Sequence, residues 1–341
     1  MSRRLSISLQ GLCLAIATAA LLSPVAAQQW VMPRTPHGHP DLQGNWNNAS
    51  LTPLQRGRNQ EGPVFTAEQV ARLEGRAEDR YVVDAQPSDP DRPPPEAGIT
   101  IVGYNQVWYH RGDLVAVING EARSSIITNP SNGRRPPLTS EAQELQRERR
   151  AFRRQFGQSD HPELRTLTDR CLMFGPNVGP PMLPNGRYNN NYTIVQTADY
   201  VMINAEVIHD TRIIQLGEPD RLPAHIRPWM GDSWGRWEGD VLVVETTNFH
   251  PMQEFNGIPA AADLKVTERF TRIDEETIIY EFTIDDPGTY TQAWGGELPF
   301  KKFHDYLYEF ACHEGNYSMA AMLSGARFEE SQAAQNRPEQ R

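Results

Sequence analysis

The chain has 341 residues, of which 38% are hydrophobic and 22% charged, so it can form one large domain or two ordinary ones around a packed core. Its net charge of −10 argues against a nucleic-acid partner, because binding to phosphates requires a basic surface. The 27 prolines and 25 glycines indicate many loops and few long helices.

The first 27 residues have the three parts of a secretory signal peptide. Arg3 and Arg4 form a basic start, Leu12–Leu22 is an apolar stretch, and Val25–Ala27 is a small-residue cleavage site. The alternative is a membrane anchor, but the apolar stretch is shorter than the roughly 20 residues that span a bilayer. We therefore expect export to the periplasm or the medium, a mature chain that starts near Gln28, and no membrane span.

Removal of the signal peptide leaves two cysteines, Cys171 and Cys312. An even number of cysteines in an exported protein favours a disulfide, so we predict that these two are joined. The bond would close a loop of roughly 140 residues, for which the chain-entropy model gives a stabilisation of at most about 5 kcal/mol. The alternative is a pair of free, buried thiols.

Residues 28–165 are expected to wrap around the rest of the protein as loops, two helices and short strands. A capping box at Thr66 predicts a helix over Thr66–Arg80, and a second, strongly charged helix is expected over Ser140–Gln155. The Pro- and Asp-rich stretch Asp84–Pro95 is typical of a linker. Short strands are expected at Val107–Tyr109, Leu114–Ile118 and Ser125–Thr128.

Residues 166–330 contain strands in close succession, and the clearest pair is a hairpin over Gly231–Phe249. We predict a two-residue turn at Glu238-Gly239, followed by a β-branched and apolar strand that starts at Asp240. Further strands are expected at Tyr192–Gln196, Tyr200–Val207, Thr211–Leu216, Leu264–Arg272, Thr277–Ile284, Tyr290–Trp294 and Tyr306–Cys312. About eight short strands with tight turns indicate an antiparallel barrel or sandwich.

Two further features complete the expected fold. Gly44-Asn45-Trp46 matches the short G-x-W pattern of the first strand of lipocalins, and a short helix over Tyr317–Glu330 precedes a disordered tail, 331–341. The predicted fold class is therefore mainly β: an antiparallel lipocalin-like barrel or sandwich with a loop- and helix-containing N-terminal portion and a short C-terminal helix.

Glu268 is the most conspicuous candidate for chemistry, because it lies in an apolar file. Successive strand residues point to opposite sides of a sheet, so Glu268 shares its face with Leu264, Val266 and Phe270. A carboxylate in that position must be paired, hydrogen-bonded or protonated, and desolvation would raise its pKa into a range that suits acid–base catalysis. The alternative is a structural ion pair with an arginine from a neighbouring strand.

A second group of candidates gathers at one turn and comprises Glu206, His209, Asp210 and Arg212. A histidine beside carboxylates can act as a base, and an arginine can hold a carboxylate or polarise a carbonyl. We assign catalytic roles to His209 and Arg212 and binding roles to Glu206 and Asp210. The alternative is that Asp210 caps the turn and Arg212 is a surface partner.

The remaining candidates lie near the C-terminal end of the predicted barrel. His313 is assigned a catalytic role and Glu314 a binding role, because a bridged Cys312 would hold both at the barrel mouth. The alternative is that His313 or Asn316 caps the following helix. Two aromatic residues of the strands, Tyr280 and Trp294, are assigned to binding.

No sequence motif indicates a cofactor or a metal. The chain lacks HExxH, zinc-type Cys/His spacing, an EF-hand loop, a P-loop and a GxSxG elbow. The nine histidines are scattered, so a metal site could only be assembled from distant residues. We expect no cofactor and no metal, and a small molecule as the partner.

Six segments between about Pro40 and Arg327 follow one another in order: PDLQGNW, RCL, NNNYTIVQTADYVMINAEVIHDTRII, RPWMGDSWGRWEGDVLVVETTNF, VTERFTRIDEETIIYEFTIDDP and YEFACHEGNYSM. In this order they resemble a large group of uncharacterised exported bacterial proteins. The resemblance implies one continuous fold and assigns no activity and no site residue.

Two functions follow from these features. The first is an exported, metal-independent enzyme (a lyase, isomerase or hydrolase) that applies acid–base chemistry to a small, partly apolar molecule. The second is a non-catalytic lipocalin-like protein that binds a small hydrophobic ligand. Glu268 beside a histidine and an arginine would favour catalysis, whereas a single carboxylate among apolar groups would favour binding.

Overall fold

The computed structural model describes residues 30–87, 90–91, 110–174, 178–185, 190–255 and 258–335, with only the backbone of residues 209, 254, 255, 258 and 259. The chain divides into two units, Met1–Val31 and Met32–Arg341, and all helices and strands named below belong to the second. The predicted signal peptide, the predicted strand Val107–Tyr109, half of the predicted linker and residues 336–341 of the predicted tail lie outside the described residues. Residues 331–335 of that tail are helical, because the C-terminal helix runs to Gln335.

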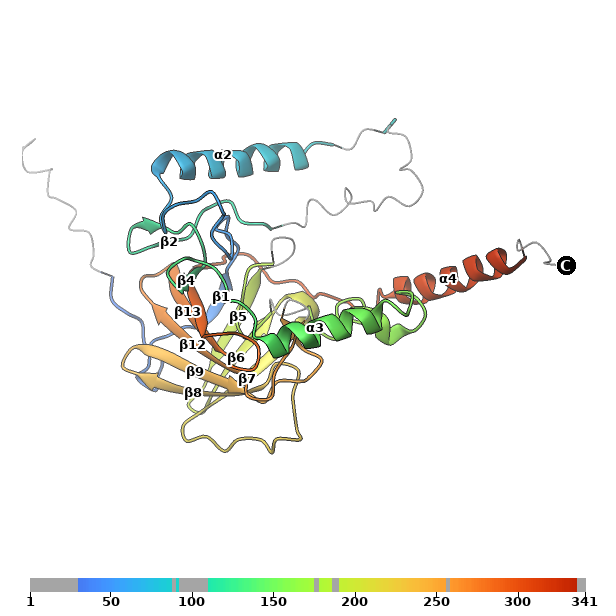
Figure 1. Ribbon diagram of the computed structural model, residues 1–341. Helices are drawn as coiled ribbons and strands as arrows, with labels where there is room; N and C mark the ends of the chain where they lie inside the picture. The colour runs from blue at the N-terminus through green and yellow to red at the C-terminus, as the bar shows by residue number, and fades with distance from the viewer. Residues whose placement is uncertain are drawn as a thin grey trace, which may run out of the picture. The chain divides into compact units, whose positions relative to one another are not determined.

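A closed barrel forms the centre of the second unit (Figure 1). Among the described residues nine strands form it: β1 (Gly44–Asn47), β5 (Asn191–Gln196), β6 (Tyr200–Ala205), β7 (Thr211–Leu216), β8 (Asp232–Glu238), β9 (Val241–Thr247), β12 (Lys265–Arg272), β13 (Thr277–Asp285) and β14 (Trp294–Lys302). Each strand pairs with the next in this order, and β1 pairs with β14 to close the barrel. The pairs are antiparallel except β7–β8, which is parallel. The predicted mainly β, barrel-type fold is confirmed.

The first barrel strand comes from the N-terminal part of the chain. Strand β1 contains the G-x-W pattern, and its Trp46 is fully buried, with its indole N–H donating to the Leu42 carbonyl at 2.8 Å. Two cations, Arg272 and Lys302, lie over the indole ring at 5.5 and 4.5 Å from its centroid. Residues well before 166 therefore complete the barrel rather than only covering it.

The other elements are short strands and helices outside the barrel cycle. The strands are β2 (Val117–Ile118), β3 (Glu121–Ala122), β4 (Ile127–Asn129), which pairs with β14, and the β10–β11 pair (Glu254–Phe255, Ile258–Pro259). The helices are α2 (Ala67–Asp84), α3 (Ser140–Arg153) and α4 (Tyr317–Gln335), with 3-10 turns η2 (Pro162–Leu164) and η4 (Val207–His209). None of these described helices combines the length and the apolar character of a membrane span.

Helix α2 begins where the capping box predicts. The Thr66 hydroxyl accepts from the Gln69 N–H at 3.2 Å, and the Gln69 side chain accepts from the Thr66 N–H at 2.8 Å. Two backbone donors that have no partner within the helix are thereby satisfied, which is the physical reason for the start at this position.

The hairpin β12–β13 confirms the predicted faces. Burial alternates along β12, and Glu268 is fully buried in line with Val266 and Phe270. Across the hairpin, Glu268 lies opposite Phe282, and Phe270 lies opposite Tyr280. The inner face of this hairpin is thus an apolar surface with one carboxylate in it.

Side chains fill the barrel around that carboxylate. The ring of Tyr280 lies 5.1 Å from Phe270 and 5.0 Å from Phe300, centroid to centroid. Met173 and Met182, which come from the segment before β5, are also fully buried in this core. Because these side chains pack closely and fill the interior, we expect a ligand site at the barrel ends or on the surface.

The predicted strand Tyr290–Trp294 is wrong, because the last barrel strand, β14, starts at Trp294 and runs to Lys302. Its sequence contains Gly295 and Gly296, which local propensity disfavours in a strand. A Cβ on either glycine would lie 2.1 Å from a backbone oxygen, that of Phe282 or that of Ile126. The two glycines are needed because β13 and β4 approach β14 this closely from both sides.

The predicted strand Tyr306–Cys312 is also wrong, since this segment has no strand structure. Its aromatic residues favour a strand by propensity, but β1 and β14 pair with each other and leave the barrel no free edge there. The predicted turn of the central hairpin is displaced by one residue: Glu238 pairs with Val241, so the turn is Gly239-Asp240, with Gly239 at φ +61°. Glu238 stays in the strand, where Arg236 and Arg269 hold its carboxylate.

The predicted disulfide is confirmed. Cys171 and Cys312 are bonded across 141 residues of sequence, with their Cα atoms 5.8 Å apart. The bond connects the segment that precedes the barrel strand β5 with the segment that follows the last barrel strand.

Candidate functional site

A buried ion pair occupies the barrel interior. The Arg212 guanidinium, from β7, contacts both carboxylate oxygens of Glu268, with Nη1–Oε2 at 2.5 Å and Nη2–Oε1 at 3.1 Å. The Tyr280 hydroxyl donates to Glu268 Oε1 at 2.8 Å and itself accepts from the Met182 N–H at 2.8 Å. Glu268 is fully buried and the Arg212 side chain is 4% exposed.

Glu268 thus forms an ion pair with an arginine, which is the alternative to a catalytic role given above. A bidentate arginine neutralises the carboxylate, and a tyrosine adds a further hydrogen bond. Burial raises the pKa of Tyr280 well above its ordinary value, so this hydroxyl stays a donor. No histidine side chain that the structure describes contacts Glu268. The arginine comes from β7, which is not a sheet neighbour of β12.

The four candidates at the turn after β6 do not form one cluster. The side chain of Arg212 enters the interior, whereas that of Glu206 is held by Asn191, so the two take part in different contacts. Asp210 follows η4, and the structure describes only the backbone of His209. These residues are close together along the chain, but β6 ends before Glu206, η4 follows it, and only Arg212 belongs to β7, so they do not share one face of a strand.

Glu206 is buried, at 7% exposed, and its contacts are neutral. The Asn191 amide donates to Oε2 at 2.6 Å, and the Tyr308 N–H approaches Oε1 at 3.4 Å. The Asn191 side-chain oxygen, Oδ1, accepts from the Asn47 amide nitrogen, which lies 2.8 Å from Nδ1 of His110. Burial raises the pKa of Glu206, and the hydrogen bonds from Asn191 and Tyr308 offset part of that rise.

Glu206 borders a broad groove with a volume of about 1040 Å³. Its wall residues come from three parts of the chain: the segment Thr168–Phe174, Glu206, and the segment between Phe303 and Ser318. Five aromatic residues contribute to the walls: Phe174, Phe303, Tyr306, Tyr308 and Phe310. The disulfide lies in the same wall, so it joins the two segments that form the groove. We refer to this feature as the Glu206 groove.

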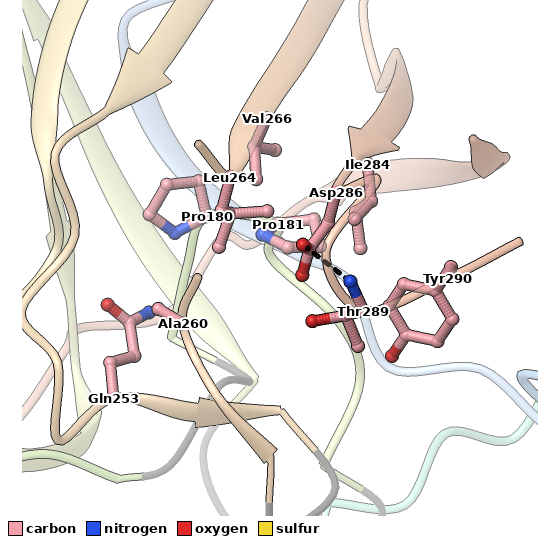
Figure 2. Close-up of a pocket in the computed structure, with 10 residues that line it drawn as sticks. All are labelled: Pro180, Pro181, Gln253, Ala260, Leu264, Val266, Ile284, Asp286, Thr289 and Tyr290. Carbon is pink, nitrogen blue, oxygen red and sulfur yellow. Dashed lines mark hydrogen bonds between the residues drawn. The ribbon is translucent and has the colours of Figure 1, made fainter. Parts of the chain in front are cut away.

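A much smaller pocket lies at the end of the inner file of β12 and β13 (Figure 2). Figure 2 shows Val266 and Ile284 on the two strands, and Asp286 joined to the Thr289 backbone by a 3.1 Å hydrogen bond. Gln253 Oε1 is buried without a hydrogen-bond partner among the described residues. The pocket volume is about 20 Å³, which is room for about one water molecule. We call this feature the mouth pocket.

The remaining candidates are dispersed. Trp294 is fully buried, with its ring edge-on to Phe282 at 5.9 Å, so it belongs to the core. His313 and Glu314 are exposed beside Cys312 and Gly315, which line the Glu206 groove. Among the described residues no group of histidine, cysteine, aspartate and glutamate side chains is placed to hold a metal ion.

Sequence reasoning missed the aromatic walls of the groove, because it assigned Tyr306–Cys312 to a strand. The density of aromatic residues in that segment was a usable signal. It also missed Asn191 and Asn47, since single asparagines within strands carry no recognisable motif. No family model matches the chain, and a search of curated proteins finds no match.

Proposed function

We propose that this protein is exported and binds a small, partly apolar molecule in the Glu206 groove. The observation that carries the proposal is the combination of a groove of about 1040 Å³, walls rich in aromatic side chains, and one buried carboxylate at the wall. Ligand sites are concave and mostly apolar, with a few polar groups that orient the ligand.

The groove is a better candidate than the other two positions. The Glu268 ion pair is enclosed by packed side chains, and its hydrogen bonds are already used within the protein. The mouth pocket has room for about one water molecule. Tyr306 and Tyr308 are 83% and 73% exposed in the groove, so their rings are accessible to a ligand.

Export is part of the proposal. The Cys171–Cys312 bond supports it, because disulfides persist in oxidising compartments such as the periplasm. The N-terminal pattern predicts cleavage before Gln28. N-terminal sequencing of protein from the periplasm or the medium should find a start near Gln28, and an intact Met1 on cytosolic protein would exclude export.

The binding proposal can be tested with a neutral probe and one matched pair of variants. We expect 2-phenylethanol to bind in calorimetric titrations, and Tyr308→Ala to weaken it about tenfold, since an aromatic contact contributes about 0.5–1.5 kcal/mol beyond its buried area. Tyr200→Ala is the control, because Tyr200 is also exposed but does not line the groove. Equal losses in both variants, or failure of the wild type to bind any small aromatic probe, would contradict the proposal.

Acid–base catalysis at the same groove is the second candidate, and the raised pKa of Glu206 favours it. A desolvated carboxyl group with a raised pKa suits a general acid or base. Bound compounds should then be converted, and Glu206→Gln should lower turnover by roughly a hundredfold or more. If mass spectrometry recovers every bound compound unchanged, catalysis is excluded and binding remains as the function.

A further inference from the structure

Glu206 is a buried carboxylate without a cationic partner among the described residues. Both of its hydrogen-bond donors, the Asn191 amide and the Tyr308 N–H, are neutral. A buried carboxylate is normally paired with a cation, as Glu268 is with Arg212, because burying an unpaired charge is costly. Glu206 borders the groove, so a cation bound there would supply the partner that the described residues do not.

The rest of the groove wall has the same electrostatic character. Of the described residues that line it, none is lysine or arginine, whereas Asp305 and Glu309 add exposed carboxylates. Asp169 also lines it but is paired with Arg165 at 3.1 Å. Charge complementarity thus favours a positively charged occupant over a neutral or negative one.

The aromatic walls fit a cation as well. Faces of tyrosine and phenylalanine rings attract ammonium groups within about 6 Å, most strongly when the ammonium is desolvated. Tyr308 is placed for this, because its own N–H approaches the Glu206 carboxylate at 3.4 Å and its side chain lines the groove. One ligand could therefore contact the buried carboxylate with its charge and the rings with its apolar part.

We propose, resting on the function proposed above, that the ligand of the Glu206 groove is a small organic ammonium compound with an apolar body. The ammonium group is the counter-ion of Glu206, and the apolar body packs on the aromatic walls. Glu206 is then the residue that selects for positive charge.

Three probes of similar size and different charge test this inference. They are 2-phenylethylammonium, 2-phenylethanol and phenylacetate, each titrated into the purified mature protein. We expect the cation to bind about tenfold or more tightly than the alcohol, and phenylacetate to bind most weakly. Similar affinities for the cation and the alcohol would overturn the charge preference and leave groove binding intact. Failure of all three to bind would overturn the proposed function as well.

A pair of charge-removing variants assigns the preference to Glu206. Glu206→Gln keeps the shape and can still accept from Asn191, so we expect it to lower the affinity for the cation about tenfold and to leave that for the alcohol unchanged. Glu218→Gln removes the same charge from an exposed residue outside the groove and serves as the control. A cation preference that survives Glu206→Gln would overturn the inference. The wild-type titrations decide the charge preference even if the variant does not fold.

Discussion

Two buried glutamates of this protein have opposite surroundings. Glu268 lies inside the barrel with a bidentate arginine and a tyrosine hydroxyl, and it is fully buried. Glu206 lies where β6 ends, with only neutral donors, and it borders the Glu206 groove. The charge of Glu268 is neutralised by the fold, whereas Glu206 has only neutral donors, and we propose that a ligand neutralises it.

Burial alone therefore does not identify a functional carboxylate in this protein. Both side chains are almost inaccessible to solvent. Glu268 lies inside the barrel, so its charge must be compensated by a cation of the protein itself, which is Arg212. Glu206 can be compensated from the groove, since the cavity reaches it. The informative property is therefore the identity of the partner and not the degree of burial.

Removal of the disulfide should have the largest effect and should act on the groove side of the comparison. We expect Cys171→Ser with Cys312→Ser to lower the free energy of unfolding by up to about 5 kcal/mol, because the bond closes a long loop. Urea denaturation measures this change. A reductant should destabilise the wild type to the level of the double variant and leave that variant unchanged. Insensitivity of the wild type to reductant would show that the bond does not contribute.

Loss of charge in the barrel interior should come next. Glu268→Gln leaves Arg212 as an uncompensated buried cation, so we expect the free energy of unfolding to fall by about 3 kcal/mol or more. The control is Glu281→Gln, on the same hairpin but on its less buried outer face, which should cost far less. Urea denaturation measures the free energy of unfolding of both variants. Equal small losses would mean that the ion pair is not structural.

The hairpin faces show what could be predicted of the fold. Alternation along Leu264–Ile284 depends only on neighbours in sequence, so it correctly placed Glu268 in the interior. Strand β14 could not be predicted in this way, because its glycines are explained by the approach of β13 and β4. The pairing of β1 with β14 likewise cannot be predicted from local sequence. It removes the free sheet edge with which the segment Tyr306–Cys312 would have to pair as a strand.

The candidate site was less accessible to prediction than the fold. Glu206 was predicted as a site residue because His209, Asp210 and Arg212 are close to it in sequence. The residues that it contacts, Asn191 and Tyr308, are distant in sequence. The pair Arg212–Glu268 joins residues 56 positions apart from strands that are not adjacent. Such contacts depend on the curvature and closure of the barrel, which no local pattern encodes.

The smallest expected effect concerns stability against pH. Burial raises the pKa of Glu206, so its contribution to stability is full below the ordinary glutamate pKa and is lost as pH rises through the raised value. Glu206→Gln should therefore gain stability relative to the wild type as pH rises through this window. Urea denaturation at a series of pH values measures it, with Glu218→Gln as the control. Parallel pH profiles for Glu206→Gln and the wild type would contradict the assignment.

The most direct test is a crystal structure of the mature protein with 2-phenylethylammonium. We expect the ammonium nitrogen to lie within about 2.7–3.2 Å of a Glu206 carboxylate oxygen, with the phenyl ring against the aromatic walls of the groove and the Glu268–Arg212 pair unchanged. A probe bound in the barrel interior in contact with Glu268, or a Glu206 groove that stays empty while the probe occupies the mouth pocket, would contradict it.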